Sequence, residues 1–304
     1  MKGKNIKDKL DKVFTNFGMD TKAWSPIISN FRDKLVALER STNYKKLLKS
    51  LFSSKDLNEF NSYVFEAQFA YDFQASGQRL SYENRQLQKK LSTVDFCYEL
   101  NEHKKIYFEL RLIQQRKWIT QSINSQIKHR KYYEIELNGN NERDETIRLQ
   151  NLILSKCQDK NGNPIKFAVG NDFINMIVVN VSELHLNMID KFDCILTTYG
   201  DHAVPFYCRR GVSGLWQQLS QNSSEQDKEL YRKFGHVRES IHGILFVRHV
   251  KNSGYLDRLF IDRELEYFIV GNHNLLQKSY IERTLEKLSF LRAWTEKESE
   301  TGKG

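Results

Sequence analysis

The chain has 304 residues, of which 39% are hydrophobic and 12% aromatic, and its formal net charge at pH 7 is +9. This composition excludes an intrinsically disordered protein, and the sequence holds no run of about 20 apolar residues that could span a membrane. The basic excess favours a polyanionic partner but does not identify one.

The cysteines and the N-terminus predict a cytoplasmic protein. Cys97, Cys157, Cys194 and Cys208 form no CxxC pair, and three of them lie in apolar stretches. This pattern favours reduced thiols over a cysteine zinc site. Residues 1–12 are rich in lysine and lack the apolar segment of a secretory signal. We therefore expect no membrane partner.

Amphipathic helices are predicted over residues 1–50, because apolar residues recur there at helical spacing. We interpret residues 1–55 as a helical cap on the core, and a basic arm bound to nucleic acid is the alternative. Residues 56–76 predict one long helix. Gly77 can close that helix in a left-handed conformation.

Strands and helices alternate over the rest of the chain. The sequence predicts strands at 78–83, 94–100, 106–113, 173–181, 241–250 and 265–270, and helices from 118, at 142–158 and at 279–294. Between them, residues 138–141 and 159–164 predict turns and residues 221–227 a polar loop. Residues 56–181 therefore follow the order helix, three strands, helix, strand. No break in composition marks a further domain.

Two neighbouring predicted strands carry a pattern of acidic and basic residues. Asp95 lies on the strand at 94–100, and Glu109 and Arg111 lie two apart on the next strand. Strand side chains alternate, so Glu109 and Arg111 share one face. The short polar connection between the strands predicts a hairpin that brings Asp95 beside Glu109. Two carboxylates and a cation could bind a divalent metal and act on a phosphodiester.

Other interpretations of these residues stay open. An acid and a base two apart on an exposed strand commonly form a solvated pair, worth under about 1 kcal/mol. Glu66 lies one turn from Tyr63 and Ala70, so it could point inward to the same site. An exposed helical glutamate is the alternative for that position.

The order of elements and the motif positions resemble the PD-(D/E)xK nuclease superfamily, which has the restriction-endonuclease-like fold. Asp95 matches the aspartate at the start of the second core strand, Glu109-Leu110-Arg111 matches the acid-x-lysine motif on the third, and Glu66 matches a helical glutamate. The sequence departs from the family pattern at two positions. Val94 stands in place of the motif proline, and Arg111 stands in place of the motif lysine.

The resemblance implies an α/β fold with a mixed sheet and helical additions at both ends. A nuclease-like domain would span residues 56–304, with its core at about 56–181 and an α/β elaboration at 182–304. The implied activity is that of a Mg²⁺-dependent endonuclease that hydrolyses DNA phosphodiester bonds, with Mn²⁺ as the alternative ion, in a bacterial or phage defence context.

The resemblance also implies roles for individual residues. Asp95, Glu109 and the carbonyl of Leu110 would hold the metal, and Glu66 would assist. Arg111 can bind phosphate through its planar fork, but it stays protonated and cannot act as a base.

A basic, aromatic-interleaved segment follows the third strand. The candidate nucleic-acid-binding residues are Gln114, Gln115, Arg116, Lys117, Lys128, Arg130 and Lys131. Phosphate contacts and base stacking would suit them, and a solvated helix face is the alternative. The oligomeric state stays open, although a homodimer would supply the two active sites that many double-strand cutters need.

Two rival functions follow from the same residues. The first is a non-catalytic nucleic-acid-binding protein with the same fold. The second is an α/β protein–protein adaptor whose charged residues are surface groups only.

Overall fold

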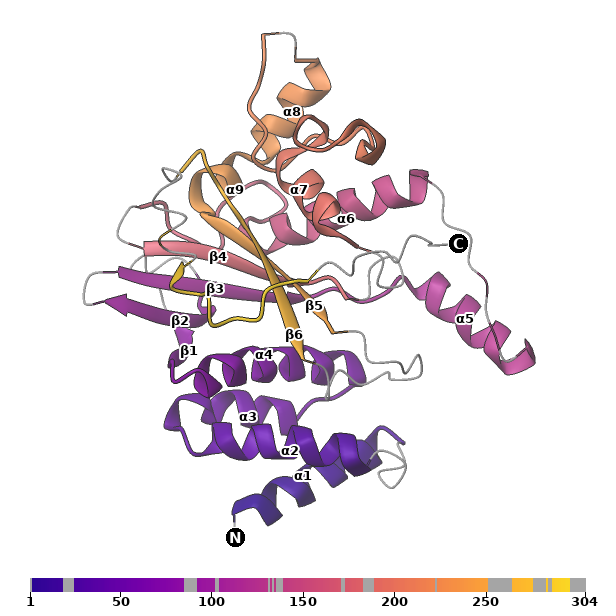
Figure 1. Cartoon of the computed structure of the whole chain (residues 1–304), viewed down its shortest axis with the longest axis vertical. Helices are drawn as coiled ribbons and strands as arrows, with labels where there is room; N and C mark the ends of the chain where they lie inside the picture. Colours follow the sequence, from indigo (N-terminus) through magenta and orange to yellow (C-terminus); the bar gives the residue numbers. More distant parts are fainter. Residues whose placement is uncertain are drawn as a thin grey trace, which may run out of the picture.

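The computed structural model describes residues 2–18, 25–84, 92–101, 104–130, 132, 134, 139–170, 173–182, 189–221, 223–250, 264–275, 283 and 286–295. A six-stranded mixed sheet lies between two layers of helices (Figure 1). The expected α/β class with a mixed sheet is therefore confirmed.

The N-terminal helices form the layer on one face of the sheet. These are α1 (Lys2–Asn16), α2 (Ser25–Glu39) and α3 (Lys45–Phe52), and all three pack against or beside α4 (Leu57–Ala75). Asp56 caps α4 by accepting a hydrogen bond from the Glu59 N–H at 2.9 Å, and Gly77 follows the helix with φ +76°. Both features match the expected helix over 56–76.

The strands lie in the sheet in the order of the sequence. They are β1 (Leu80–Asn84), β2 (Val94–Asn101), β3 (Lys104–Leu112), β4 (Phe173–Asn180), β5 (Gly243–His249) and β6 (Leu265–Gly271). The pairs β3–β4 and β4–β5 are parallel, and the other three pairs are antiparallel. Central strand β4 is buried on both faces, which explains its continuous apolar run.

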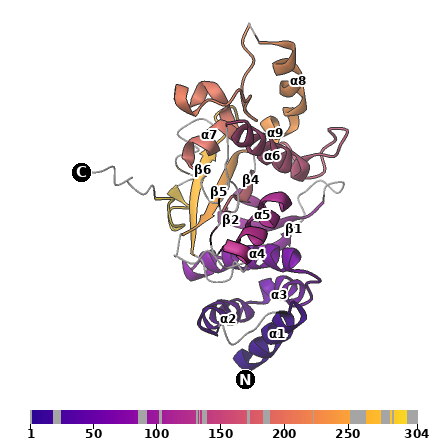
Figure 2. The same ribbon diagram turned by 90° about the vertical axis from the view of Figure 1, so that its right-hand side faces the viewer.

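The second layer of helices covers the opposite face. It contains α6 (Gly139–Cys157), α7 (Lys191–Tyr199) and α9 (Gly235–Ser240), and α8 (Glu225–Lys233) lies at its outer end (Figure 1). Helix α5 (Lys117–Arg130) follows β3 and extends away from the body of the molecule (Figure 1), on the side that faces the viewer in Figure 2. None of the helices in the described residues is long and apolar enough to cross a membrane.

The sheet divides the apolar interior into two clusters. Phe96, Phe108 and Leu110 face the N-terminal helices, whereas Tyr107 and Ile177 face α6 and its neighbours. Helix α4 is apolar on nearly all sides because it lies between the sheet and α1–α3. Three of the four cysteines are buried and all are free thiols, as expected.

The structure corrects two of the sequence-based boundaries. Residues 139–141 form the first turn of α6, where a turn was expected. Gly and Asn residues are tolerated there because the first N–H groups of a helix have no intrahelical partner in any case. Helix α8 begins at Glu225, inside the expected polar loop, and Ser224 and Asp227 form its capping box.

The expected C-terminal helix is wrong over residues 287–294. This segment forms a turn and then a bridge alongside β6, where the N–H of Tyr267 donates to the Arg292 carbonyl at 2.9 Å. Leu288, Leu291 and Trp294 are buried, so their three-residue spacing imitated a helix. Most of residues 276–285 lie outside the described part of the chain.

Phe69 is a central aromatic residue in the contact between α4 and the sheet. Its ring lies 5.3 Å from that of Phe108 and 5.0 Å from that of Phe73, and it is fully buried. Phe69→Ala should lower the free energy of unfolding by about 3 to 5 kcal/mol, measured by denaturant titration. Phe206→Ala is the matched control, because Phe206 is 82% exposed. Equal stability of the two variants would contradict this packing.

Candidate active site

Strands β2 and β3 separate at the residues that carry the acidic motif. Their backbone pairing reaches Phe96 opposite Phe108, so the next positions along are Asp95 and Glu109. There the Oδ2 of Asp95, in place of a backbone carbonyl, accepts a hydrogen bond from the N–H of Leu110 at 2.7 Å. Strand β2 meanwhile stays paired with β1 as far as Val94. The sheet therefore forks beside the two carboxyl groups.

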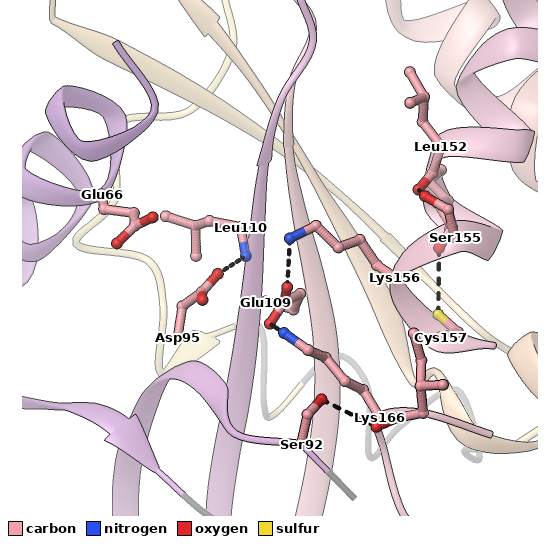
Figure 3. Close-up of polar contacts among 12 residues, drawn as sticks. Glu66, Ser92, Asp95, Glu109, Leu110, Leu152, Ser155, Lys156, Cys157 and Lys166 are labelled. Carbon is pink, nitrogen blue, oxygen red and sulfur yellow. Dashed lines mark hydrogen bonds and ion pairs between the residues drawn. The ribbon is translucent and has the colours of Figure 1, made fainter. Parts of the chain in front are cut away.

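Glu109 is a fully buried carboxylate held by two lysines. Its Oε1 lies 2.6 Å from the Nζ of Lys156 on α6, and its Oε2 lies 2.5 Å from the Nζ of Lys166, which precedes β4. Figure 3 shows both amines converging on Glu109. A carboxylate with no exposure needs such partners, because burial of an unpaired charge is costly.

Glu66 reaches the same region from α4. Its Oε2 accepts a hydrogen bond from the hydroxyl of Tyr82 on β1 at 2.9 Å, and Figure 3 shows its carboxyl group on the Asp95 side of Leu110. Glu66 therefore points inward, which is one of the two interpretations that its position in the sequence allowed.

The three carboxyl groups are electrostatically coupled. Burial, and then the charge of Asp95, raise the pKa of Glu66 well above its ordinary value. Burial, and then the charge of Glu109, raise the pKa of Asp95 to about 6. In both cases Lys156 acts in the opposite direction by stabilising the negative form. Mutually strained acids of this kind are concentrated at functional sites.

The site does not present ready-made metal ligands. Within the described residues, no group of three or more His, Cys, Asp or Glu side chains could hold a metal ion as arranged. Both carboxylate oxygens of Glu109 form ion pairs with lysines. The donor chemistry still fits Mg²⁺, because Glu66, Asp95 and Glu109 offer hard carboxylate oxygens, and burial and the charge of Glu109 raise the pKa of the other two. Metal binding would require Lys156 or Lys166 to release Glu109.

Among the described residues, Arg111 is not paired with the acidic cluster. It makes no ion pair in the part of the chain that the structure describes, and its buried Nε has no hydrogen-bond partner there. The positive charge beside the carboxylates comes from Lys156 and Lys166 instead.

The expected nucleic-acid-binding residues divide into an anchored group and an exposed group. Arg116 pairs with buried Glu145, and the Gln114 carbonyl accepts a hydrogen bond from Arg148 at 2.6 Å. The side chain of Gln115 accepts the Arg116 N–H at 3.1 Å. The exposed residues, all on α5, are Lys117, Lys128 and Arg130. Lys131 lies outside the described residues.

Sequence analysis missed the two lysines that contact Glu109. Lys156 could have been found, because it lies seven residues after Leu149 and three after Ile153, and thus on the apolar face of its helix. Lys166 follows an irregular segment, and no periodicity indicates where it points. Its position depends on contacts such as the hydrogen bond from Ser92 Oγ to the Ile165 carbonyl, 3.0 Å long.

Comparisons of the chain with protein-family models, with curated proteins and with solved structures find no match. Function must therefore be argued from the geometry and chemistry of this site.

The strain in the acidic cluster can be measured through stability. The folded protein keeps a proton on Asp95 up to about pH 6, whereas the unfolded chain releases it near pH 4. Stability should therefore fall as the pH rises across this interval. Asp95→Asn keeps an acceptor for the Leu110 N–H and removes the charge. It should be more stable than the wild type by about 1 to 3 kcal/mol at about pH 8, and by little near pH 4.

Thermal and denaturant unfolding over this pH range would test the expectation. Asp144→Asn, at an exposed position on α6, serves as the control and should show no such pH-dependent gain. A loss of stability in Asp95→Asn at about pH 8 would contradict the strained cluster.

Proposed function

We propose that the protein is a divalent-metal-dependent nuclease acting on DNA, with a restriction-endonuclease-like core. The observation that carries the proposal is the electrostatic coupling of Glu66, Asp95 and Glu109 beside Lys156 at the fork between β2 and β3. Support also comes from the element order α4, β1, β2, β3, α6, β4, which α5 interrupts between β3 and α6, and in which β3 pairs antiparallel with β2 and parallel with β4.

The residues would divide the work as follows. Asp95, Glu109 and the Leu110 carbonyl would hold the ion, and Glu66 would assist. A divalent ion held there would offset phosphate charge and lower the pKa of the attacking water. Arg111, with its unbonded Nε, would bind a phosphate oxygen.

Lys156 would take the position of the lysine that the acid-x-base motif lacks. It reaches the acidic residue of that motif from α6, although β3 carries Arg111 at the expected place. An amine close to the scissile phosphate can stabilise the negative charge that develops in the transition state. Lys156 would then fill this role in place of Arg111. Lys166 would keep Glu109 neutralised while Lys156 moves to substrate.

A non-catalytic nucleic-acid-binding protein is the second candidate. The observation that favours it is that Glu109 already has both oxygens in ion pairs, at 2.6 and 2.5 Å. In that case the lysines would be permanent partners of Glu109, and metal would not enter.

Measuring cleavage together with metal binding distinguishes the nuclease from the non-catalytic nucleic-acid-binding protein. With Mg²⁺ or Mn²⁺ the purified protein should cut DNA, and Asp95→Asn and Lys156→Met should each reduce the rate by about 100-fold or more. Mg²⁺ should raise the Tm of the wild type but not that of Asp95→Asn. Lys228→Met, which removes an exposed lysine of α8, should behave as the wild type.

Two outcomes would count against the nuclease. DNA binding without cleavage and without a Mg²⁺-dependent rise in Tm would favour the non-catalytic candidate. Cleavage that persists in Asp95→Asn would place the chemistry elsewhere or in a contaminant.

A further inference from the structure

Helix α5 projects from the molecule directly after the strand that carries Glu109 and Arg111. Only residues 113–116 separate it from β3. Among the described elements, none packs along it beyond marginal contact, and Figure 1 shows it extending away from the sheet. A helix of this length is rarely stable alone in water, so its exposure suggests that it serves a partner.

The base of α5 is held firmly. Arg116 pairs with buried Glu145, and Ile119 is 2% exposed. At the far end, Gln126 exchanges two hydrogen bonds with the backbone of Glu134, at 2.8 and 3.0 Å. The helix is therefore anchored to the molecule at its base, and its far end contacts the segment that follows it.

That face has the chemistry of a nucleic-acid reader. Lys117, Gln121, Ser125 and Lys128 follow one another at spacings of four, four and three, so they lie along one side of the helix. All four are exposed. Residues 117–130 include no Asp or Glu, and Lys128, His129 and Arg130 occupy the last turn. The face formed by these four residues is thus basic and polar, which is complementary to a polyanion. Trp118, beside Lys117, is 47% exposed.

The spacing of the two lysines matches duplex DNA. Eleven residues of helix separate them, a rise of about 16 Å. The major groove is about 12 Å wide and admits an α-helix, so lysines at this separation can reach the phosphates on its two sides. Gln121 lies between them, and glutamine can bond adenine through two hydrogen bonds. No hydrogen bond occupies the Gln121 side chain within the described residues.

We propose that α5 enters the major groove of double-stranded DNA, with Lys117 and Lys128 on the phosphates and Gln121 on a base edge. This assigns the substrate as duplex and Gln121 as a specificity-determining residue. It rests on the proposed function only in taking DNA as the ligand, because α5 can bind without cleavage.

The electrostatic part is tested by fluorescence anisotropy of a labelled duplex in EDTA, with the full chain. Lys117→Ala/Lys128→Ala should weaken binding about tenfold or more and reduce the slope of log Kd against log salt by about two. The control, Lys45→Ala/Lys49→Ala, removes the same charge from exposed positions on α3 and should have little effect. Methyl green, a major-groove ligand, should compete, whereas distamycin in the minor groove should not.

The base-reading part is tested by selection from a randomised duplex pool, followed by sequencing. The wild type should enrich an adenine at one position, and Gln121→Ala should lose that preference while retaining most of its affinity. The inference is overturned if single-stranded DNA of equal length binds as well as duplex, or if the α5 and α3 double variants bind equally. If the protein cleaves DNA but shows either of these equalities, the role of α5 is overturned and the nuclease proposal is retained. If α5 binds duplex DNA but no cleavage occurs, the role of α5 is retained and the nuclease proposal is overturned.

Discussion

The buried ion cluster around Glu109 is the interaction on which the rest of the structure depends. It joins β3 to the end of α6 through Lys156 and to the segment before β4 through Lys166. The whole crossover from β3 to its parallel neighbour is thereby fixed at one point. Loss of either lysine leaves Glu109, which has no solvent exposure, with half its compensation, and this is the costly case for a buried ion pair. The same contact therefore supports the fold and assembles the candidate site.

The cluster combines stabilising and destabilising contacts. Glu109 is compensated, whereas burial and the charge of Asp95 raise the pKa of Glu66, and burial and the charge of Glu109 raise the pKa of Asp95. A protein selected for stability alone would not keep three acids together, because replacing one by an amide removes the repulsion. The metal ion proposed above would account for their proximity, at a cost to stability in its absence. Arg111 and α5 extend the same region with positive charge, so anion recognition and ion binding would meet at the forked edge of the sheet.

Several elements could be predicted from the sequence because their signals are local. Apolar periodicity and a capping aspartate indicated α4, and Gly77 indicated where it ends. Alternation along β3 separated Phe108 and Leu110 from Glu109, and the structure has them on different faces. The prediction of a helix in the C-terminal segment was wrong for a physical reason. Leu288, Leu291 and Trp294 are spaced as on a helix, but hydrogen bonds to β6 hold their backbone in another conformation.

The sequence by itself determined the alternating helices and strands, the acidic pair on β2 and β3, and the basic character of α5, because propensity, periodicity and charge act over a few residues. Only the tertiary structure decided which cation meets Glu109. Arg111 is two residues away along the strand, yet Lys156 and Lys166, 47 and 57 residues away, supply the contacts. Such pairings depend on how a helix crosses a sheet and where a loop closes, and no local pattern encodes that geometry.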